Sequence, residues 1–151
     1  MSRLIKFMIG ILLIPALAGC IGEEYDFSPP TVSLINPDDI TQEEKLAEAN
    51  IDWTYDNKYN KETKDIYSLA KKQSKMVFTA GQNIQFSIED GHFDIKKVQI
   101  ALWQNEDKIE VAIDHTGQSF TLPNEKGEYI IVVDLPTDKG DAQYVGNIVI
   151  Q

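Results

Sequence analysis

The sequence predicts a mainly β protein, an antiparallel sandwich or barrel with one or two short helices before it or inserted in it. Three observations favour this class. After Met76, apolar and polar residues alternate at a period of two through most of the chain. Turn residues such as Asp90-Gly91 and Thr116-Gly117 separate these short runs. The helical period of 3.6 residues occurs before Met76 instead.

Composition limits the classes of function. The chain has 151 residues, 42% of them hydrophobic and 25% charged, which suits one globular domain. A formal charge of −10 and a pI near 4.6 argue against nucleic acid as a partner, because phosphate binding requires clustered Lys and Arg. The single cysteine, Cys20, excludes an internal disulfide, a zinc ribbon and an iron–sulfur centre.

Residues 1–19 have the features of an export signal. Arg3 and Lys6 precede an apolar run over 7–18, and small residues follow it. The run is shorter than the roughly 20 apolar residues that a bilayer-spanning helix needs, and acidic sequence begins at Glu23. We therefore expect a cleaved signal rather than a permanent membrane span.

The tetrapeptide Leu17-Ala18-Gly19-Cys20 resembles the lipobox of bacterial lipoproteins. The resemblance implies that the signal is cut before Cys20 and that this cysteine carries a diacylglyceryl thioether. Two acyl chains, at about 0.8 kcal/mol per buried methylene, make a stable membrane anchor. The implied location is the outer side of the cell membrane. The alternative is an ordinary secreted protein with a chance cysteine beside its cleavage site.

Residues 20–30, which end in Pro29-Pro30, predict a short, stiff tether. At about 3.3–3.6 Å per residue, this segment reaches at most roughly 40 Å. Cleavage would remove Arg3 and Lys6 but no acid, which leaves 12 basic residues against 24 acidic ones and a net charge of −12. Anionic lipids repel such a charge, so we expect the domain to stand off the membrane surface.

Residues 31–75 are expected to form a strand followed by a helical segment. The stretch 31–35 is rich in β-branched residues and is followed by Asn36-Pro37, so it predicts a strand. Thr41-Gln42-Glu43-Glu44 has the form of a capping box, and good helix formers follow over 45–49. These features predict a first short helix at 45–49.

A second short helix is predicted by helical spacing of Ile66, Leu69, Ala70 and Gln73. The rest of the chain, 76–151, is expected to be the sandwich core, and we take 31–151 as one domain. Alternation predicts strands over 84–88, 98–102, 109–113, 120–122, 129–133 and 145–150.

The stretch that begins at Gly127-Glu128-Tyr129 and continues past Asp138-Lys139-Gly140 to the last strand resembles the final hairpin of bacterial immunoglobulin-like domains. The resemblance covers about residues 77–150. It implies an immunoglobulin-like antiparallel sandwich in which Tyr129 is the corner tyrosine, whose hydroxyl bonds back to the backbone. The resemblance also implies that the domain is a recognition or spacer module rather than a catalytic domain.

Three sets of residues have the composition of a catalytic or metal site. Asp114, His115 and Ser119 are the residue types of a hydrolase triad, but side chains of adjacent residues diverge, so this acid cannot orient this base. His92 and His115, with Met76, could bind copper. Acidic loop residues could supply oxygen ligands to calcium, although solvated turns are the simpler interpretation; they are Asp90, Asp94, Asp134, Asp138 and Asp141.

Aromatic residues supply the candidate contact surface. Trp53 and Tyr55 alternate with polar residues, and Tyr59 and Tyr67 follow; we expect most of these rings to be buried, with Tyr55 and Tyr59 the most exposed. The turns at Asn105 and Asp138 lie outside the predicted strands. The candidate partner residues are therefore Tyr55, Tyr59, Asn105 and Asp138.

Together these patterns predict a membrane-anchored cell-envelope lipoprotein that acts as a non-enzymatic binding module without a cofactor. Its partners would be the membrane, through lipid on Cys20, and an envelope protein or wall ligand that the sequence does not identify. The alternative is a metal- or small-ligand-binding accessory lipoprotein of a transporter, which would use His92, His115 or the acidic loops.

Overall fold

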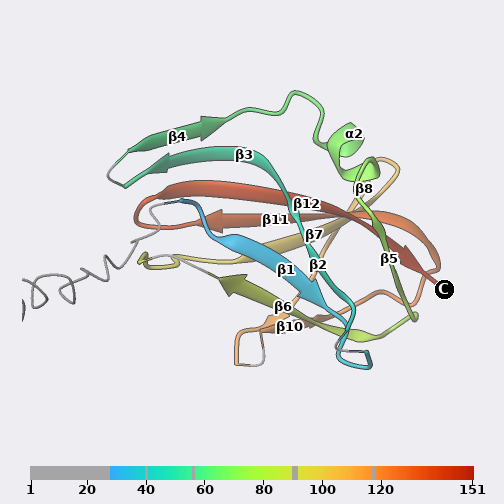
Figure 1. Cartoon of the computed structure of the whole chain (residues 1–151). Helices are drawn as coiled ribbons and strands as arrows, with labels where there is room; N and C mark the ends of the chain where they lie inside the picture. The colour runs from blue at the N-terminus through green and yellow to red at the C-terminus, as the bar shows by residue number, and fades with distance from the viewer. Residues whose placement is uncertain (1–27, 40, 56, 90–91, 117) are drawn as a thin grey trace, which may run out of the picture.

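A computed structural model describes residues 28–39, 41–55, 57–89, 92–116 and 118–151. They form two β-sheets that share a core, together with one short helix (Figure 1). The predicted mainly β class is confirmed. The expected signal, 1–19, and Cys20 lie outside the described residues. No helix in the described part of the chain is long and apolar enough to span a membrane.

The first sheet has five strands in the order β2-β1-β6-β10-β9, and each neighbouring pair is antiparallel. Its strands are β1 (Thr31–Ile35), β2 (Glu43–Lys45), β6 (Asn83–Glu89), β9 (Ile113–Asp114) and β10 (Ser119–Thr121). The strands β2 and β9 at its two edges are short, which limits pairing with other chains.

The second sheet has the antiparallel order β4-β3-β12-β11-β7-β8. Its strands are β3 (Ala47–Thr54), β4 (Lys58–Lys61), β5 (Lys75–Phe78), β7 (Gln99–Gln104), β8 (Asp107–Glu110), β11 (Gly127–Pro136) and β12 (Gly140–Ile150). One edge of β12 pairs with β3 over its first half and with β5, in parallel, over its second half. The segment between β1 and β5 thereby contributes strands to both sheets.

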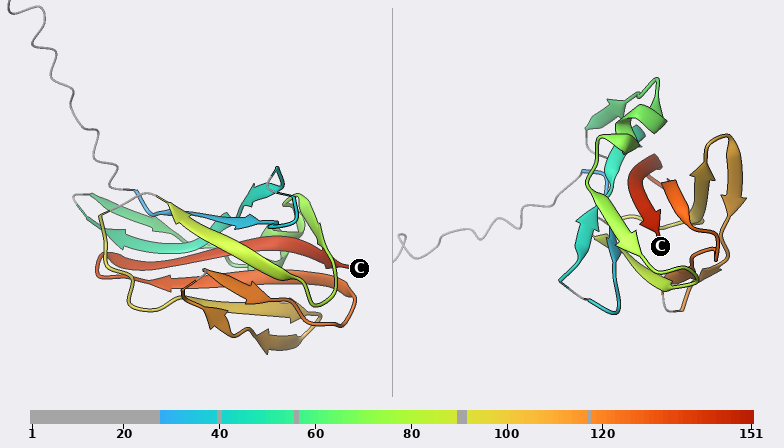
Figure 2. Two further views of the ribbon diagram at one scale, coloured as in Figure 1. Left: turned by 90° about the horizontal axis from the view of Figure 1, so that it is seen from below. Right: turned by 90° about the vertical axis from the view of Figure 1, so that its right-hand side faces the viewer.

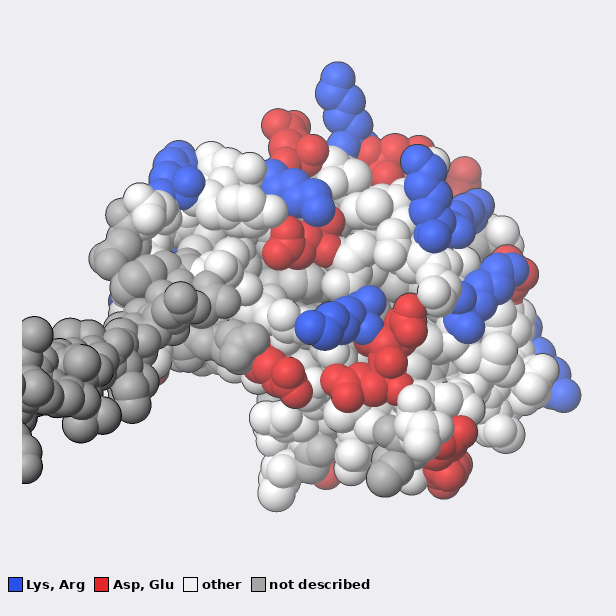
Figure 3. All heavy atoms as spheres, viewed as in Figure 1, with Lys and Arg blue, Asp and Glu red and all other residues white. Residues whose placement is uncertain are grey.

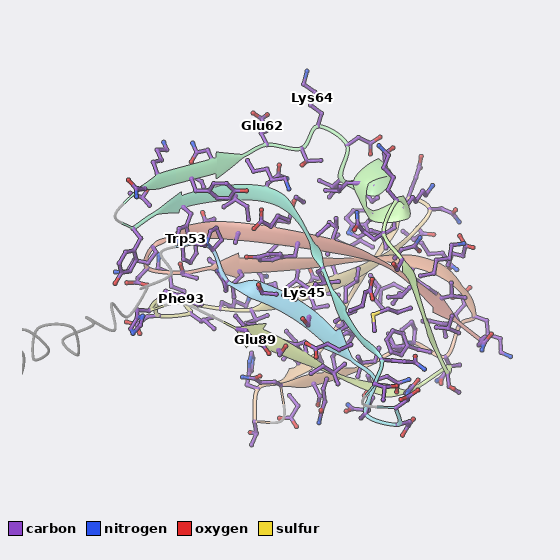
Figure 4. The ribbon with its side chains drawn as sticks, in the orientation of Figure 1. Lys45, Trp53, Glu62, Lys64, Glu89 and Phe93 are labelled. Atoms are coloured by element: carbon purple, nitrogen blue, oxygen red, sulfur yellow. The ribbon has the colours of Figure 1, made fainter. Side chains whose placement is uncertain are left out.

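The core between the sheets contains the inward-facing residues of both. Trp53 on β3 is only 1% exposed and packs edge-to-face on Phe93, with ring centroids 5.4 Å apart (Figure 4). The hydrogen bond expected of Tyr129 is present: its hydroxyl donates to the Glu125 carbonyl oxygen at 2.9 Å. The 1% exposure of Trp53 confirms its predicted burial.

The helix expected at 45–49 is wrong, because these residues enter strands β2 and β3. Thr41 and Gln42 do not cap a helix; their side chains donate to the Asp39 carboxylate at 2.6 and 2.9 Å and close a turn. Along β3, pairing with β12 buries Ala49 on one side of the sheet and Trp53 on the other. This tertiary pairing outweighs the local helix propensity of Glu, Lys and Ala.

The second predicted helix is confirmed as α2 (Ile66–Lys71). Its N-cap is Asp65, whose carboxylate accepts from the Ser68 amide at 2.9 Å. The hydrogen bond from the Ser68 hydroxyl, at 2.7 Å, followed by the one from its amide, lowers the pKa of Asp65. Ala70 faces the second sheet and packs with apolar residues on its outer face, so α2 makes a smaller second core there.

The strand predicted at 109–113 is divided between the two sheets. Residues up to Glu110 belong to β8 in the second sheet, and Ile113 starts β9 in the first. Ile109, Val111 and Ile113 nevertheless all pack against the same core. The apolar alternation therefore continues through the crossing, which explains why the pattern did not mark it.

Candidate functional site

The outer face of the second sheet has an apolar half and a polar half. Helix α2 covers the apolar half, where Ile130, Val132 and Val145 pack against it. The polar half is an open groove of about 600 Å³, which we call the outer groove. Its main polar lining residues are Asn50, Asp52, Gln99, Asp134, Asp141 and Gln143.

A row of hydrogen-bonded side chains crosses the outer groove. The Thr63 amide donates to Asn50 Oδ1 at 2.8 Å, and Asn50 Nδ2 donates to Gln143 Oε1 at 2.7 Å. Gln143 Nε2 then donates to Asp134 Oδ1 at 2.8 Å. The strand register places Gln99 next in the same row. These bonds hold the side chains in one orientation, which is the preorganisation that a binding surface needs.

The segment between β1 and β5 builds one wall of the groove. β3 contributes Asn50 and Asp52, and the end of β4 contributes Lys61 and Glu62. In Figure 4, Glu62 and Lys64 project from the connection between β4 and α2, away from the sheets. Without this segment, the outer face beside β12 would have no such wall.

The charges of the outer groove are mainly negative. The residues that line it include the acids Asp52, Glu62, Asp134 and Asp141 and one base, Lys61, whose Nζ lies 3.8 Å from Glu48 Oε2. Such a lining can accept hydrogen bonds from neutral polar or cationic groups. The face seen in Figure 3 differs, since acidic and basic side chains are interspersed there.

The structure separates the residues of the predicted copper set. Met76 is in β5, His92 is in the connection between β6 and β7, and His115 is between β9 and β10. Within the described ranges, no three or more His, Cys, Asp or Glu side chains are grouped to hold a metal ion. Of the predicted calcium ligands, Asp90 lies outside the described residues. Asp134 and Asp141 line the outer groove.

The residues of the predicted triad are near one another, but the acid has a structural role. Asp114 and Ser119 are register partners on β9 and β10. The Asp114 carboxylate accepts from the Thr116 amide at 2.9 Å and so stabilises the turn that carries His115. This is the role of a turn aspartate.

Three of the four candidate partner residues lie at one end of the sandwich. We call it the entry end, because the first described residues, Ser28 and Pro29, lie there beside Tyr59. Figure 2 shows that β1 begins at this end and that the C-terminus is at the opposite end. Tyr55 and Asp138 are at the entry end as well. Asn105, with φ of 56°, is in the β7–β8 turn at the opposite end.

At the entry end, one lysine links Tyr55 to Asp138. Lys139 Nζ lies 4.9 Å from the centroid of the half-buried Tyr55 ring and 2.9 Å from Asp138 Oδ2. The hydrogen bond from Lys139, followed by one from the Asp94 amide, lowers the pKa of Asp138. Tyr55 and Asp138 were predicted as separate contact residues, and the fold places them in one cluster with Lys139.

Tyr59 is 40% exposed, as expected, and its hydroxyl donates to Glu48 Oε2 at 2.8 Å. This hydrogen bond raises the pKa of Tyr59. Nearby, Tyr144 is buried, and its hydroxyl donates to the Pro30 carbonyl oxygen at 2.5 Å. Burial raises the pKa of Tyr144. The Tyr144 hydrogen bond holds the chain in place where it enters the sandwich.

The outer groove was not predicted from the sequence. Gln99 and Gln143 are polar residues in predicted strands, which marks an outward-facing side but not a shared surface. Asn50 was not recognised as a strand residue because its strand, β3, begins within the stretch 45–49 that was expected to be helical. No known family model matches the chain, and no curated protein is significantly similar to it.

Proposed function

We propose that this protein is a lipid-anchored lipoprotein of the cell envelope, and that its exported part is a non-enzymatic binding module with an immunoglobulin-like fold. The outer groove is the observation that carries the binding proposal. It is an open hollow of about 600 Å³, within the range of about 300–1,000 Å³ typical of ligand pockets. Its polar side chains are already held in place by hydrogen bonds.

Strand order supports the immunoglobulin-like assignment. In that fold, one sheet has the strand order A-B-E-D and the other contains C, F and G. The neighbours β1-β6-β10-β9 and β7-β11-β12 follow these orders. The bond from the Tyr129 hydroxyl to Glu125 is that of a corner tyrosine. In this assignment, β2, β3, β4 and α2 are an insertion after the first strand.

The position of Ser28 supports an anchored arrangement. Ser28 is eight positions after Cys20, and at about 3.3–3.6 Å per position this stretch reaches at most roughly 30 Å. Lipid on Cys20 would therefore keep the entry end close to the membrane. The end that carries Asn105 would then face away from it.

The anchor is tested by replacing Cys20. Cys20→Ser is expected to abolish incorporation of an alkyne-tagged fatty acid, because the serine hydroxyl is not a substrate for thioether formation. The matched control is the double variant Cys20→Ser/Ser28→Cys, which keeps one cysteine but places it outside the lipobox, and it should also remain unlabelled. Undiminished lipid labelling of Cys20→Ser would refute the anchor.

The binding surface is tested by photo-crosslinking in intact cells. A photoreactive amino acid at Gln99, on the edge of the outer groove, is expected to form an adduct with an envelope partner. The same residue at Gln85 is the control, since Gln85 is equally an exposed glutamine on a strand but belongs to the first sheet. Asp141→Lys should abolish the Gln99 adduct by reversing a groove charge. Equal adducts from both positions would contradict a specific groove.

A small-ligand-binding accessory is the second candidate, because the volume of the outer groove also suits a small polar ligand. The midpoint of thermal unfolding, measured on the full chain with a chelator, calcium, copper, zinc or wall fragments in turn, distinguishes this accessory from a module that binds a protein. A ligand at a hundred times its Kd stabilises by about 2.7 kcal/mol. A raised midpoint with one of these and no protein adduct at Gln99 would favour the accessory.

A further inference from the structure

An exposed isoleucine lies on the loop at the entry end. Ile95 is 44% exposed, and it follows Phe93 and Asp94 in the segment between β6 and β7. One exposed apolar side chain is ordinary on a protein surface. The position of Ile95 is what matters, because its loop is at the entry end, which the proposed anchor on Cys20 would hold near the membrane.

The loop is held firmly on both sides of Ile95. Before it, Phe93 packs on Trp53, and the Asp94 amide donates to Asp138 Oδ1 at 2.7 Å. Ile95 itself forms a bridge with Thr137. After it, the Lys96 amide donates to the Pro136 carbonyl oxygen at 3.0 Å. The backbone therefore holds the Ile95 side chain outward, because its neighbours are tied to the core and to the β11–β12 turn.

Exposed charged residues flank this side chain in the sequence, with Asp94 before it and two lysines after it. Lys96 and Lys97 follow Ile95 directly and are exposed, and Lys58 is exposed at the start of β4. The Asp138 carboxylate at this end is engaged by Lys139 and by the Asp94 amide. An apolar side chain bordered by lysines suits the boundary between lipid headgroups and acyl chains, where lysine extends its ammonium to the phosphates.

The proposed tether brings this surface to the membrane. Ser28 follows Cys20 by only eight positions, and a stretch of this length confines the entry end within roughly 30 Å of the bilayer. Confinement raises the effective concentration of lipid at this end, so a contact that is weak in free solution becomes occupied. The net charge of −12 keeps the rest of the domain away from anionic lipid.

We propose that the entry end docks on the lipid surface, with Ile95 inserted at the headgroup level and Lys96 and Lys97 against the phosphates. This inference rests on the proposed lipid anchor at Cys20. Docking would hold the sandwich upright, with the end that carries Asn105 pointing away from the bilayer and the outer groove facing sideways.

The test uses the acylated full chain in vesicles of phosphatidylcholine and phosphatidylglycerol. Because the thiol of Cys20 is consumed by the anchor, Ile95→Cys introduces the only free thiol, which is labelled with a polarity-sensitive fluorophore. Val77→Cys is the matched control, since Val77 is 41% exposed on β5 at the far end. Apolar side chains at an interface lie about 5–10 Å into the boundary between headgroups and acyl chains, and lipids brominated near the headgroup quench a fluorophore that is inserted there.

We expect blue-shifted, quenched emission at position 95 and water-like, unquenched emission at position 77. Lys96→Glu/Lys97→Glu in the Ile95→Cys background should weaken the quenching. Equal emission at the two positions would overturn the docking while leaving the anchor intact. Labelling of the parent chain at Cys20 itself would instead show that the anchor is absent, so the two failures are distinguishable.

Discussion

Replacing Trp53 with alanine is expected to lower the free energy of unfolding by about 3–5 kcal/mol, the range for deleting a large buried aromatic side chain. Trp53 lies on the inner face of β3 and packs edge-to-face on Phe93. The substitution removes this contact and leaves a cavity that the surrounding strands cannot fill. Urea unfolding of the full chain, followed by circular dichroism, measures the loss.

Trp103→Ala is the matched control, because it also removes an indole from a strand. Trp103 is only half-buried, and it contacts Tyr67 on the outer side of the sheet, with ring centroids 5.7 Å apart. Its loss should cost about 1–2 kcal/mol, since less apolar area returns to water. A larger loss from Trp103→Ala than from Trp53→Ala would contradict the assigned core.

Gly140→Ala is expected to destabilise the protein by about 2–3 kcal/mol, because it adds backbone strain and a steric clash. Gly140 has φ of 140° where β12 begins, and its register partner on β3 is Trp53. A Cβ at this position would meet the carbonyl oxygen of Asp52, a backbone atom that cannot move without disturbing the β3–β12 pairing. The midpoint of urea unfolding measures this effect.

Asp141→Ala is the control for this substitution, since it changes the next residue of the same strand. Asp141 is exposed on the outer face, and its truncation should change stability by no more than about 0.5 kcal/mol. Equal stability of the Gly140→Ala and Asp141→Ala variants would show that β3 and β12 are not in the register described.

Some residues of the candidate site were predicted from the sequence, but the contacts that bring them together were not. Tyr55 and Asp138 were expected at the surface because turn residues flank them, and both are near the entry end. Their common contact, Lys139, joins two turns more than eighty positions apart in the chain. No local pattern contains such a contact. The row from Asn50 to Asp134 likewise depends on three strands meeting in one register.

The sequence by itself determined most strands from β6 to β12, because a strand with one face in the core must alternate apolar and polar residues, and this is a local property. It also determined α2, because the helical spacing of Ile66, Leu69 and Ala70 is a local signal. Only the tertiary structure decided that 47–54 is a strand, since pairing with β12 overrides local helix propensity. The outer groove depends on the same pairing, so it became visible only when distant segments were brought together.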